Sequence, residues 1–332
     1  MTRVGAVIVN YNCAPWALDA ALSILGDAGD GAEVVIVDNA SPDRSADYFR
    51  TAADLPHAQT ATAPRDVRFG ETAHIAIDPA VVEPGVNVLL SPSNGGFAAG
   101  CNIGLKALNR QYLDLILLLN PDAMLGQGAT DAFARRLADP GIGLCGASVV
   151  SFDAPHRAQA LGGARLDPLT LLGGNLGAGL SLEEAPSTEE IENALDYPLG
   201  AAIAVERFYV ERAGFLDERY FLYYEEADWA FAGRSFARVG WARDAVVYHR
   251  YGASSKSVPS ATAEPSNRSP LSDYHMARSR LLFALKWRPL LAPSLVGLGG
   301  VQAAHRLMRG KPQQARAVAL GSLPGAARAF PV

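Results

Sequence analysis

Four short apolar runs constrain the fold of this chain more than any other feature of its sequence. They occupy residues 4–9, 34–37, 86–90 and 115–119, and each is rich in Val, Ile or Leu. Strands that are apolar on both faces are typical of parallel sheets covered by helices. Helical spacing over 14–25 and 100–110 places helices between these runs. The first half is therefore predicted to be α/β, an open and mostly parallel sheet with helices on both faces.

Composition excludes several other classes of protein. The 332 residues are 49% hydrophobic and 19% charged, enough to bury a sizeable core. The net charge of −5 and the absence of a long basic run argue against nucleic-acid binding. Three dispersed cysteines without CxxC spacing favour a reducing, cytoplasmic compartment. We expect neither a signal peptide, because the first apolar run is too short, nor a membrane-spanning helix.

Polar residues follow each predicted strand. Ligands of open α/β sheets bind at the carboxyl ends of the strands, so these clusters are expected to lie together at one edge. The clusters are Asn10-Tyr11-Asn12, Asp38-Asn39-Ala40-Ser41, Ser93-Asn94-Gly95-Gly96 and Asn120-Pro121-Asp122.

The stretch YYEEADW crowds Glu225, Glu226 and Asp228 beside aromatic rings. Desolvation and like-charge repulsion raise the pKa of a carboxyl group, which suits it to act as a general base near neutral pH. The alternative is structural, because acidic residues are ordinary in the first turn of a helix. On that interpretation Asp228 caps a helix that starts near residue 227. We expect this helix to run through Phe236 and to be ended by Gly240, and a strand over 245–248 to lead to His249.

Six motifs together resemble family 2 inverting glycosyltransferases of the GT-A fold, in the rhamnosyltransferase-like branch. In chain order they are VIVNYN, VDNAS, NGGFAAGCNIG, LLLNPDA, FLDERYFLYYEEADW and VVYHRYG, which span about residues 4–255. The resemblance implies a nucleotide-sugar donor, dTDP-rhamnose first, and a divalent metal, Mn²⁺ or Mg²⁺. It also implies an acceptor hydroxyl on a bacterial surface or secreted glycan, or on a lipid-linked acceptor. The alternatives are a UDP-hexose donor and a catalytically silent nucleotide-sugar-binding scaffold.

The resemblance also implies roles for individual residues. Asp122 and His249 would hold the metal, although Asn120 stands where the family more often has a carboxylate. Glu226 would be the catalytic base, Glu225 would face the acceptor, and Asp228 is the second candidate for the base. The donor would contact Tyr11, Asp38, Asn39, Asn94, Gly96, Phe97, Asn102 and Asn120. Without the resemblance, these residues have ordinary structural interpretations: turns at strand ends, packed aromatic side chains and the first residues of helices.

The remaining segments carry less information. We predict a transferase domain over 1–255, then a linker and a helical region over 256–332. Residues 162–198 are interpreted as a surface excursion without chemistry. The glycine pattern near residue 100 does not match GxGxxG, which disfavours a dinucleotide oxidoreductase. The apolar segment near residue 295, flanked by basic residues, is compatible with peripheral contact to the inner face of the plasma membrane, a packed helix pair or a homodimer.

Overall fold

The predicted apolar runs form adjacent strands of one large sheet. We describe a computed structural model of the chain, which covers residues 2–53, 67–71, 85–108, 110–250 and 268–328. Strands β1, β2, β4 and β5 are parallel neighbours, as expected from their apolar faces. The sheet runs in the order β3 (Val67–Glu71), β4 (Gly85–Leu90), β2 (Ala32–Asp38), β1 (Val4–Asn10), β5 (Leu115–Leu119), β12 (Ala202–Glu206), β7 (Ile142–Ser151), β13 (Arg238–His249) and β6 (Ala123–Leu125).

The later strands make the sheet mixed. β12 is antiparallel to both β5 and β7, whereas β13 is parallel to β7 and antiparallel to β6. β8 (Ala158–Leu161) is antiparallel to the second half of β7, where it pairs with residues 148–150 beyond the stretch that pairs with β12. A small second sheet contains β10 (Gly173–Asn175), β9 (Gly163–Leu166) and β11 (Tyr197–Pro198).

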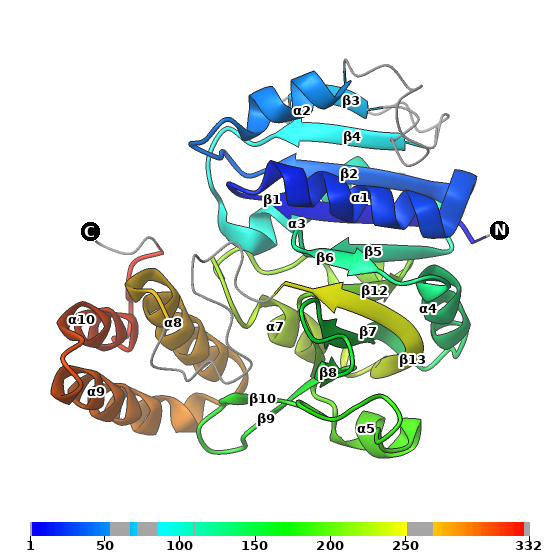
Figure 1. Cartoon of the computed structure of the whole chain (residues 1–332). Coiled ribbons are helices and arrows are strands. Elements are labelled where there is room, and N and C mark those ends of the chain that lie inside the picture. Colours follow the sequence, from blue (N-terminus) through cyan, green and yellow to red (C-terminus); the bar gives the residue numbers. More distant parts are fainter. Residues whose placement is uncertain (1, 54–66, 72–84, 109, 251–267, 329–332) are drawn as a thin grey trace.

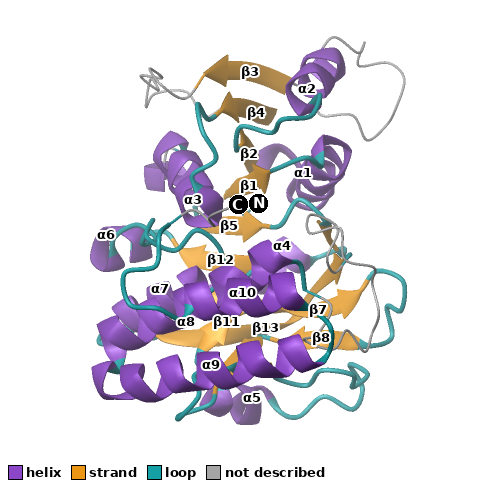
Figure 2. Ribbon diagram, turned by 90° about the vertical axis from the view of Figure 1, so that its left-hand side faces the viewer, coloured by secondary structure: helices purple, strands orange, loops and turns teal. Residues whose placement is uncertain are grey.

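Helices cover both faces of the large sheet, as predicted (Figures 1 and 2). One core packs the sheet against α1 (Ala14–Ala28), α2 (Ser45–Ala53) and α4 (Ala129–Leu137). The opposite core packs it against α3 (Gly96–Ala107), α6 (Tyr209–Ala213) and α7 (Glu225–Gly233). Burying apolar strands between two helical layers is the main source of stability in such a fold.

Three helices form a separate layer beside this body: α8 (Pro270–Trp287), α9 (Ala292–Met308) and α10 (Pro312–Gly321). A third apolar cluster joins α8 and α9 to the region around α7, through Phe283 and Tyr224 among others. The predicted boundary at residue 255 and most of the predicted linker lie outside the described residues. Within the described part of the chain, no helix combines the length and the apolar character needed to cross a bilayer.

Two sequence predictions are wrong in detail. The helix after YYEEADW ends at Gly233 rather than near residue 236, and β13 begins at Arg238 rather than at residue 245. The segment 162–198, predicted as a surface excursion, contains β9, β10 and α5 (Thr188–Ala194), whose capping box joins Ser187 and Glu190. A bulge shifts the register of β13 between Ala242 and Val246, so its apolar pattern is interrupted and its first half resembles a loop.

Candidate active site

The two predicted metal ligands meet at the carboxyl edge of the sheet. Asp122 follows β5 and directly precedes β6, and His249 is the last residue of β13. The β6–β13 pairing places His249 opposite Ala123, next to Asp122. His249 Nε2 lies 3.3 Å from Asp122 Oδ1, and only 9% and 3% of these two side chains is exposed. The fold therefore buries an imidazole against a carboxylate that is distant in sequence.

Gln159 on β8 fixes the orientation of this histidine. Its amide nitrogen donates to the His249 carbonyl oxygen at 2.9 Å, which leaves Gln159 Oε1 to accept from His249 Nδ1 at 2.8 Å. In the neutral imidazole the proton is then on Nδ1, and Nε2 is the lone-pair nitrogen nearest Asp122.

This pair has the chemistry of a divalent cation site. Asp122 Oδ1 accepts no hydrogen bond from any described residue, although it is buried. A buried carboxylate oxygen facing an imidazole nitrogen is stabilised by a cation held between them. No third His, Cys, Asp or Glu joins them within the described ranges. The two side chains therefore fit Mn²⁺ or Mg²⁺ that completes its shell with phosphate oxygens and water.

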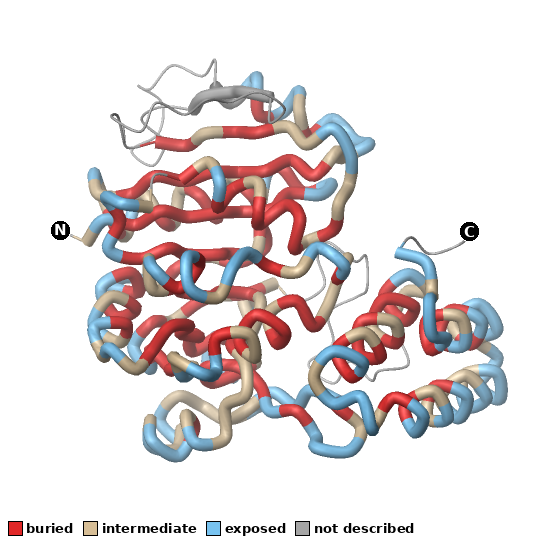
Figure 3. The backbone as a smooth tube through the Cα atoms, turned by 180° about the vertical axis from the view of Figure 1, so that it is seen from behind, coloured by how far each residue is buried: buried red, intermediate tan, exposed pale blue. Residues whose placement is uncertain are grey.

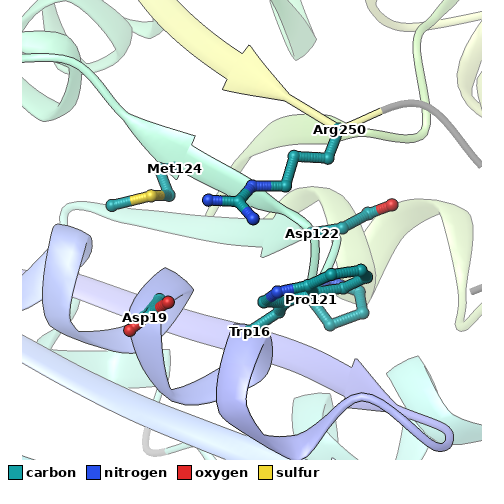
Figure 4. A pocket seen from close by; sticks show the side chains of 6 residues that line it. All are labelled: Trp16, Asp19, Pro121, Asp122, Met124 and Arg250. Atoms are coloured by element: carbon teal, nitrogen blue, oxygen red, sulfur yellow. The ribbon is translucent and has the colours of Figure 1, made fainter. Parts of the chain in front are cut away.

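A hollow lies beside Asp122, between α1 and the carboxyl edge of the large sheet (Figure 4). It is lined by Trp16, Asp19, Pro121, Asp122, Met124 and Arg250. The Arg250 backbone donates to the Asp122 carbonyl oxygen at 2.9 Å, and its guanidinium lies 4.0 Å from the centre of the Phe152 ring. Figure 4 shows that guanidinium turned into the hollow and the Asp122 carboxylate turned away from it. A positive group next to the cation site suits an anionic ligand.

The backbone before α7 is strained and positions the acidic cluster. Tyr223 and Tyr224 have φ values of 67° and 68°, in the left-handed region that residues other than glycine rarely adopt. Bonds from neighbouring elements hold this turn. Tyr224 donates its hydroxyl to the Leu171 carbonyl oxygen at 2.7 Å, and Ser279 on α8 donates to the Leu222 carbonyl oxygen at 2.9 Å. The chain therefore turns sharply into α7 at Glu225.

Glu225 and Glu226 form a buried pair in the first turn of α7. Each has one buried carboxylate oxygen without a hydrogen-bond partner among the described residues. Burial raises the pKa of Glu226 from its ordinary 4.5 to about 7. Burial, and then the charge on Glu226, hold the pKa of Glu225 well above its ordinary value. Only 5% of Glu225 is exposed, whereas Glu226 is half-buried, so Glu226 is the more accessible of the two.

A short loop lies between Glu226 and the turn that carries Asp122. A methyl group built on Gly200 would lie 3.4 Å from Glu226 Oε1. The next residue, Ala201, accepts a hydrogen bond from the backbone of Asn120 at 2.9 Å. Glu226 and the 120–122 turn therefore border the same three-residue loop, 199–201, at the same end of the sheet.

Asp228 has a different environment from its two neighbours. Its carboxylate accepts hydrogen bonds from Lys286 Nζ at 2.8 Å, Trp287 Nε1 at 2.7 Å and the Tyr220 hydroxyl at 3.1 Å. The prediction that Asp228 caps its helix is wrong, because α7 begins at Glu225 and no side chain caps it. The second-candidate base is thus engaged in bonds to the C-terminal helix.

Several predicted donor-binding side chains form bonds between loops at this edge. Asp38, 4% exposed, accepts from Asn10 Nδ2 at 2.7 Å and from the Ser41 hydroxyl at 2.6 Å. Asn39 Nδ2 donates at 3.0 Å to both Asn94 Oδ1 and the Gly96 carbonyl oxygen. The first three polar clusters are therefore joined as expected, and Asp38 and Asn39 help to hold them together.

The other predicted donor residues divide into exposed and buried positions. Tyr11, after β1, is 36% exposed, and Asn120 is half-buried beside the cation site. Asn102 is only 2% exposed and bonds the Leu216 backbone in both directions, at 2.9 and 3.0 Å. The Phe97 backbone donates to the Phe221 carbonyl oxygen at 2.9 Å. Donor contact by these residues stays a prediction.

Sequence reasoning did not find Gln159, Gly200 or Arg250. Arg250 directly follows His249, so its position in the chain was a usable signal. Gln159 and Gly200 lie in segments without a distinctive pattern, and only the pairing of β8 and β12 into the sheet brings them to the site.

Comparison of whole structures identifies the fold. No protein-family model matches the sequence, and no curated protein matches it. The structure is similar to the crystal structure of GalNAc-T7 with UDP, GalNAc and Mn²⁺, with a TM-score of 0.52 and 13% identity. That match covers 76% of this chain but only 44% of GalNAc-T7. It is also similar to the mannosyltransferase PcManGT from Pyrobaculum calidifontis in complex with GDP-Man and Mn²⁺, with a TM-score of 0.50 and 14% identity over 96% of this chain and 85% of that one.

These two likenesses establish the GT-A fold that the sequence motifs predicted. At such low identity they establish nothing about the donor, the acceptor or the stereochemistry.

Proposed function

We propose that this chain is a metal-dependent inverting glycosyltransferase that uses a nucleoside-diphosphate sugar. One observation supports this most. The buried Asp122–His249 pair and the carboxyl group of Glu226, with its pKa raised to about 7, border the same loop at the carboxyl edge of the sheet. Glycosyl transfer from a nucleoside diphosphate requires at least two groups. One binds a cation that stabilises the leaving diphosphate, and the other accepts the proton of the acceptor hydroxyl.

Glu226 is the base in this proposal. An acceptor hydroxyl transfers its proton to the Glu226 carboxylate as its oxygen bonds to the anomeric carbon of the sugar. The bond from that carbon to the phosphate oxygen breaks on the opposite face, and the nucleoside diphosphate leaves. One displacement of this kind inverts the anomeric configuration. Partial exposure lets the acceptor reach Glu226, whereas Glu225 is almost fully buried.

Asp122 and His249 would hold the divalent metal, with Gln159 orienting the histidine. The metal, when bound, neutralises the charge that develops on the departing diphosphate. The Arg250 guanidinium lies in the hollow next to Asp122 and supplies a further positive charge on that side. Tyr11 is exposed at the end of β1 and is available to lie against the nucleotide base.

The donor and acceptor are proposed from the motif resemblance. We propose dTDP-rhamnose as the first donor to test, and a glycan of the bacterial surface or a lipid-linked precursor as the acceptor. A UDP-hexose is the second donor. GalNAc-T7 was solved with UDP and PcManGT with GDP-Man, so proteins of this fold accommodate different nucleotides.

Donor binding with and without metal tests the proposal. We expect Mn²⁺ to promote donor binding and slow donor hydrolysis, and EDTA to abolish both. Asp122→Asn should weaken Mn²⁺-dependent donor binding by at least about tenfold, measured by calorimetry. Asp244→Asn is the matched control, because the Asp244 side chain is 79% exposed and lies outside the hollow, in the bulge of β13.

Equal donor affinity in wild type and Asp122→Asn would contradict the metal site. Donor binding without any hydrolysis or transfer, across the nucleotide-sugar panel, would favour the silent scaffold instead.

A further inference from the structure

Charge is distributed very unevenly along this chain. All 34 Asp and Glu residues, but only 20 of the 29 Lys and Arg residues, precede residue 274. The last 59 residues therefore contain no acidic side chain. They contain nine basic residues: Arg278, Arg280, Lys286, Arg288, Arg306, Arg309, Lys311, Arg316 and Arg328. An acidic body is joined to a basic helical layer.

The outer face of α9 is exposed and apolar. Its inner positions, Leu295 and Gly299, pack against the rest of the layer. Its outer positions recur at helical spacing and are mostly apolar, namely Pro293, Gly297, Gly300, Val301, Ala304 and Met308, with Ser294 and His305 as the exposed polar residues among them. Val301 is 66% exposed and Met308 is 78% exposed. Leu290, in the short 3-10 helix Pro289–Leu291 directly before α9, is 93% exposed. Figure 3 shows this side of α9 as a largely exposed strip at the edge of the molecule.

Basic side chains stand at both ends of this face. Arg288 is exposed before α9, and Arg309 is exposed directly after Met308. Arg316 is exposed on the adjacent α10. Arg306 and Lys286 of the same layer point inward, where they form ion pairs with Asp273 at 2.7 Å and with Asp228 at 2.8 Å. The exposed charges thus border the apolar strip rather than cover it.

We propose that the face formed by Leu290, Val301 and Met308, with Arg288, Arg309 and Arg316 around it, binds the surface of an anionic lipid bilayer. Apolar side chains enter the boundary between headgroups and acyl chains, and the arginines contact lipid phosphates. The acidic body is repelled by the same surface, so the C-terminal layer faces the lipid.

The two other plausible occupants fit this surface less well. Nucleic acid offers phosphates to the arginines but no apolar partner for Val301 and Met308. A second copy that packs the same face about a twofold axis would bring the basic ends of two chains into one interface. The bilayer surface satisfies both the apolar and the charged groups. This inference does not depend on the proposed transferase activity.

Vesicle flotation of the purified full chain tests the proposal. We expect binding to vesicles that contain phosphatidylglycerol and little binding to phosphatidylcholine alone, with binding weakened by salt. The double variant Val301→Asp/Met308→Asp should bind at least about tenfold more weakly. Tyr48→Asp is the matched control, because Tyr48 is 41% exposed on α2, at the end of the molecule opposite α9 (Figure 1). It should bind as wild type does.

Circular dichroism tests whether each variant is folded, and sedimentation equilibrium measures whether it self-associates. The proposal is overturned if the wild type does not bind the anionic vesicles, if it binds both vesicle types equally, or if the double variant and Tyr48→Asp bind alike. It is also overturned if the double variant changes only the oligomeric state, because the occupant is then a second copy.

Discussion

Asp228 Oδ2 accepts a hydrogen bond from Lys286 Nζ at 2.8 Å, and this contact connects α7 to the last turn of α8. Only 3% of the Asp228 side chain is exposed, compared with 30% of Lys286. Trp287 on the same turn donates to the other carboxylate oxygen at 2.7 Å. Asp228 is two residues beyond Glu226, so the C-terminal helix supports the helix that carries the candidate base. A charge buried in this way is costly when its partner is removed.

We therefore expect Lys286→Met to destabilise the protein by about 2 kcal/mol, because the bonds from Trp287 and Tyr220 remain. Urea unfolding at neutral pH measures this change. Arg44→Met is the control, because Arg44 forms an ion pair that is largely exposed to solvent, and its loss should cost less than about 0.5 kcal/mol. Equal changes in the free energy of unfolding would mean that the buried contact of Lys286 stabilises the protein no more than an exposed ion pair does.

The sequence predicted the strands better than the site. Runs that are apolar on both faces can only be buried between helices, so β1, β2, β4 and β5 were recognisable from local pattern. The polar clusters were expected at one edge for the same reason, because strands of a parallel sheet end together. The pairing of Asp122 with His249 follows from the β6–β13 register, which no local pattern encodes.

The acidic cluster shows where sequence reasoning fails. Local pattern gives Glu225, Glu226 and Asp228 the same crowded surroundings. Their different environments come from distant elements: Gly200 lies next to Glu226, whereas Lys286 and Trp287 neutralise and bind Asp228. The helix start was misplaced for a related reason. The strained turn at Tyr223 and Tyr224 is held by α8 and by the loop at Leu171, not by its own sequence.

The raised pKa of Glu226 predicts how transfer depends on pH. A base must be ionised to accept a proton, so kcat should rise with pH up to about 7 and then level off. Glu226→Gln should lower kcat by at least about 100-fold and leave donor affinity unchanged. Glu189→Gln, on the exposed side of α5, is the control and should retain wild-type kcat. A Glu226→Gln variant that stays active would exclude Glu226 as the base.

Burial of Glu225 predicts an effect on stability that is independent of activity. The pKa of Glu225 in the folded protein is above its ordinary 4.5, so the folded state holds a proton that the unfolded state releases. The contribution of Glu225 to stability is then fully present below about pH 4.5, and it is lost as the pH rises through the raised pKa. For comparison, a pKa of about 7 for Glu226 instead of 4.5 corresponds to roughly 3 kcal/mol of folding free energy that is present at low pH and absent at high pH.

Glu225→Gln keeps the shape of the side chain and removes the charge. We expect this variant to melt at a higher temperature than the wild type at pH 8, with a much smaller difference at pH 4.5. Thermal melts across this pH range make the comparison. If the variant is less stable than the wild type at pH 8, the carboxyl group is held ionised in the folded protein, contrary to the effect of its burial.

Gln159 gives a test of the metal site that leaves both metal ligands intact. Its Oε1 accepts from His249 Nδ1 at 2.8 Å, and residues that orient a metal-binding histidine typically contribute about 10- to 100-fold to metal affinity. Gln159→Leu should therefore weaken Mn²⁺ binding by that factor, as measured by calorimetry. Gln313→Leu, exposed on α10, is the control for the loss of an amide. Unchanged Mn²⁺ affinity in Gln159→Leu would show that His249 either does not bind the ion or needs no partner at Nδ1 to do so.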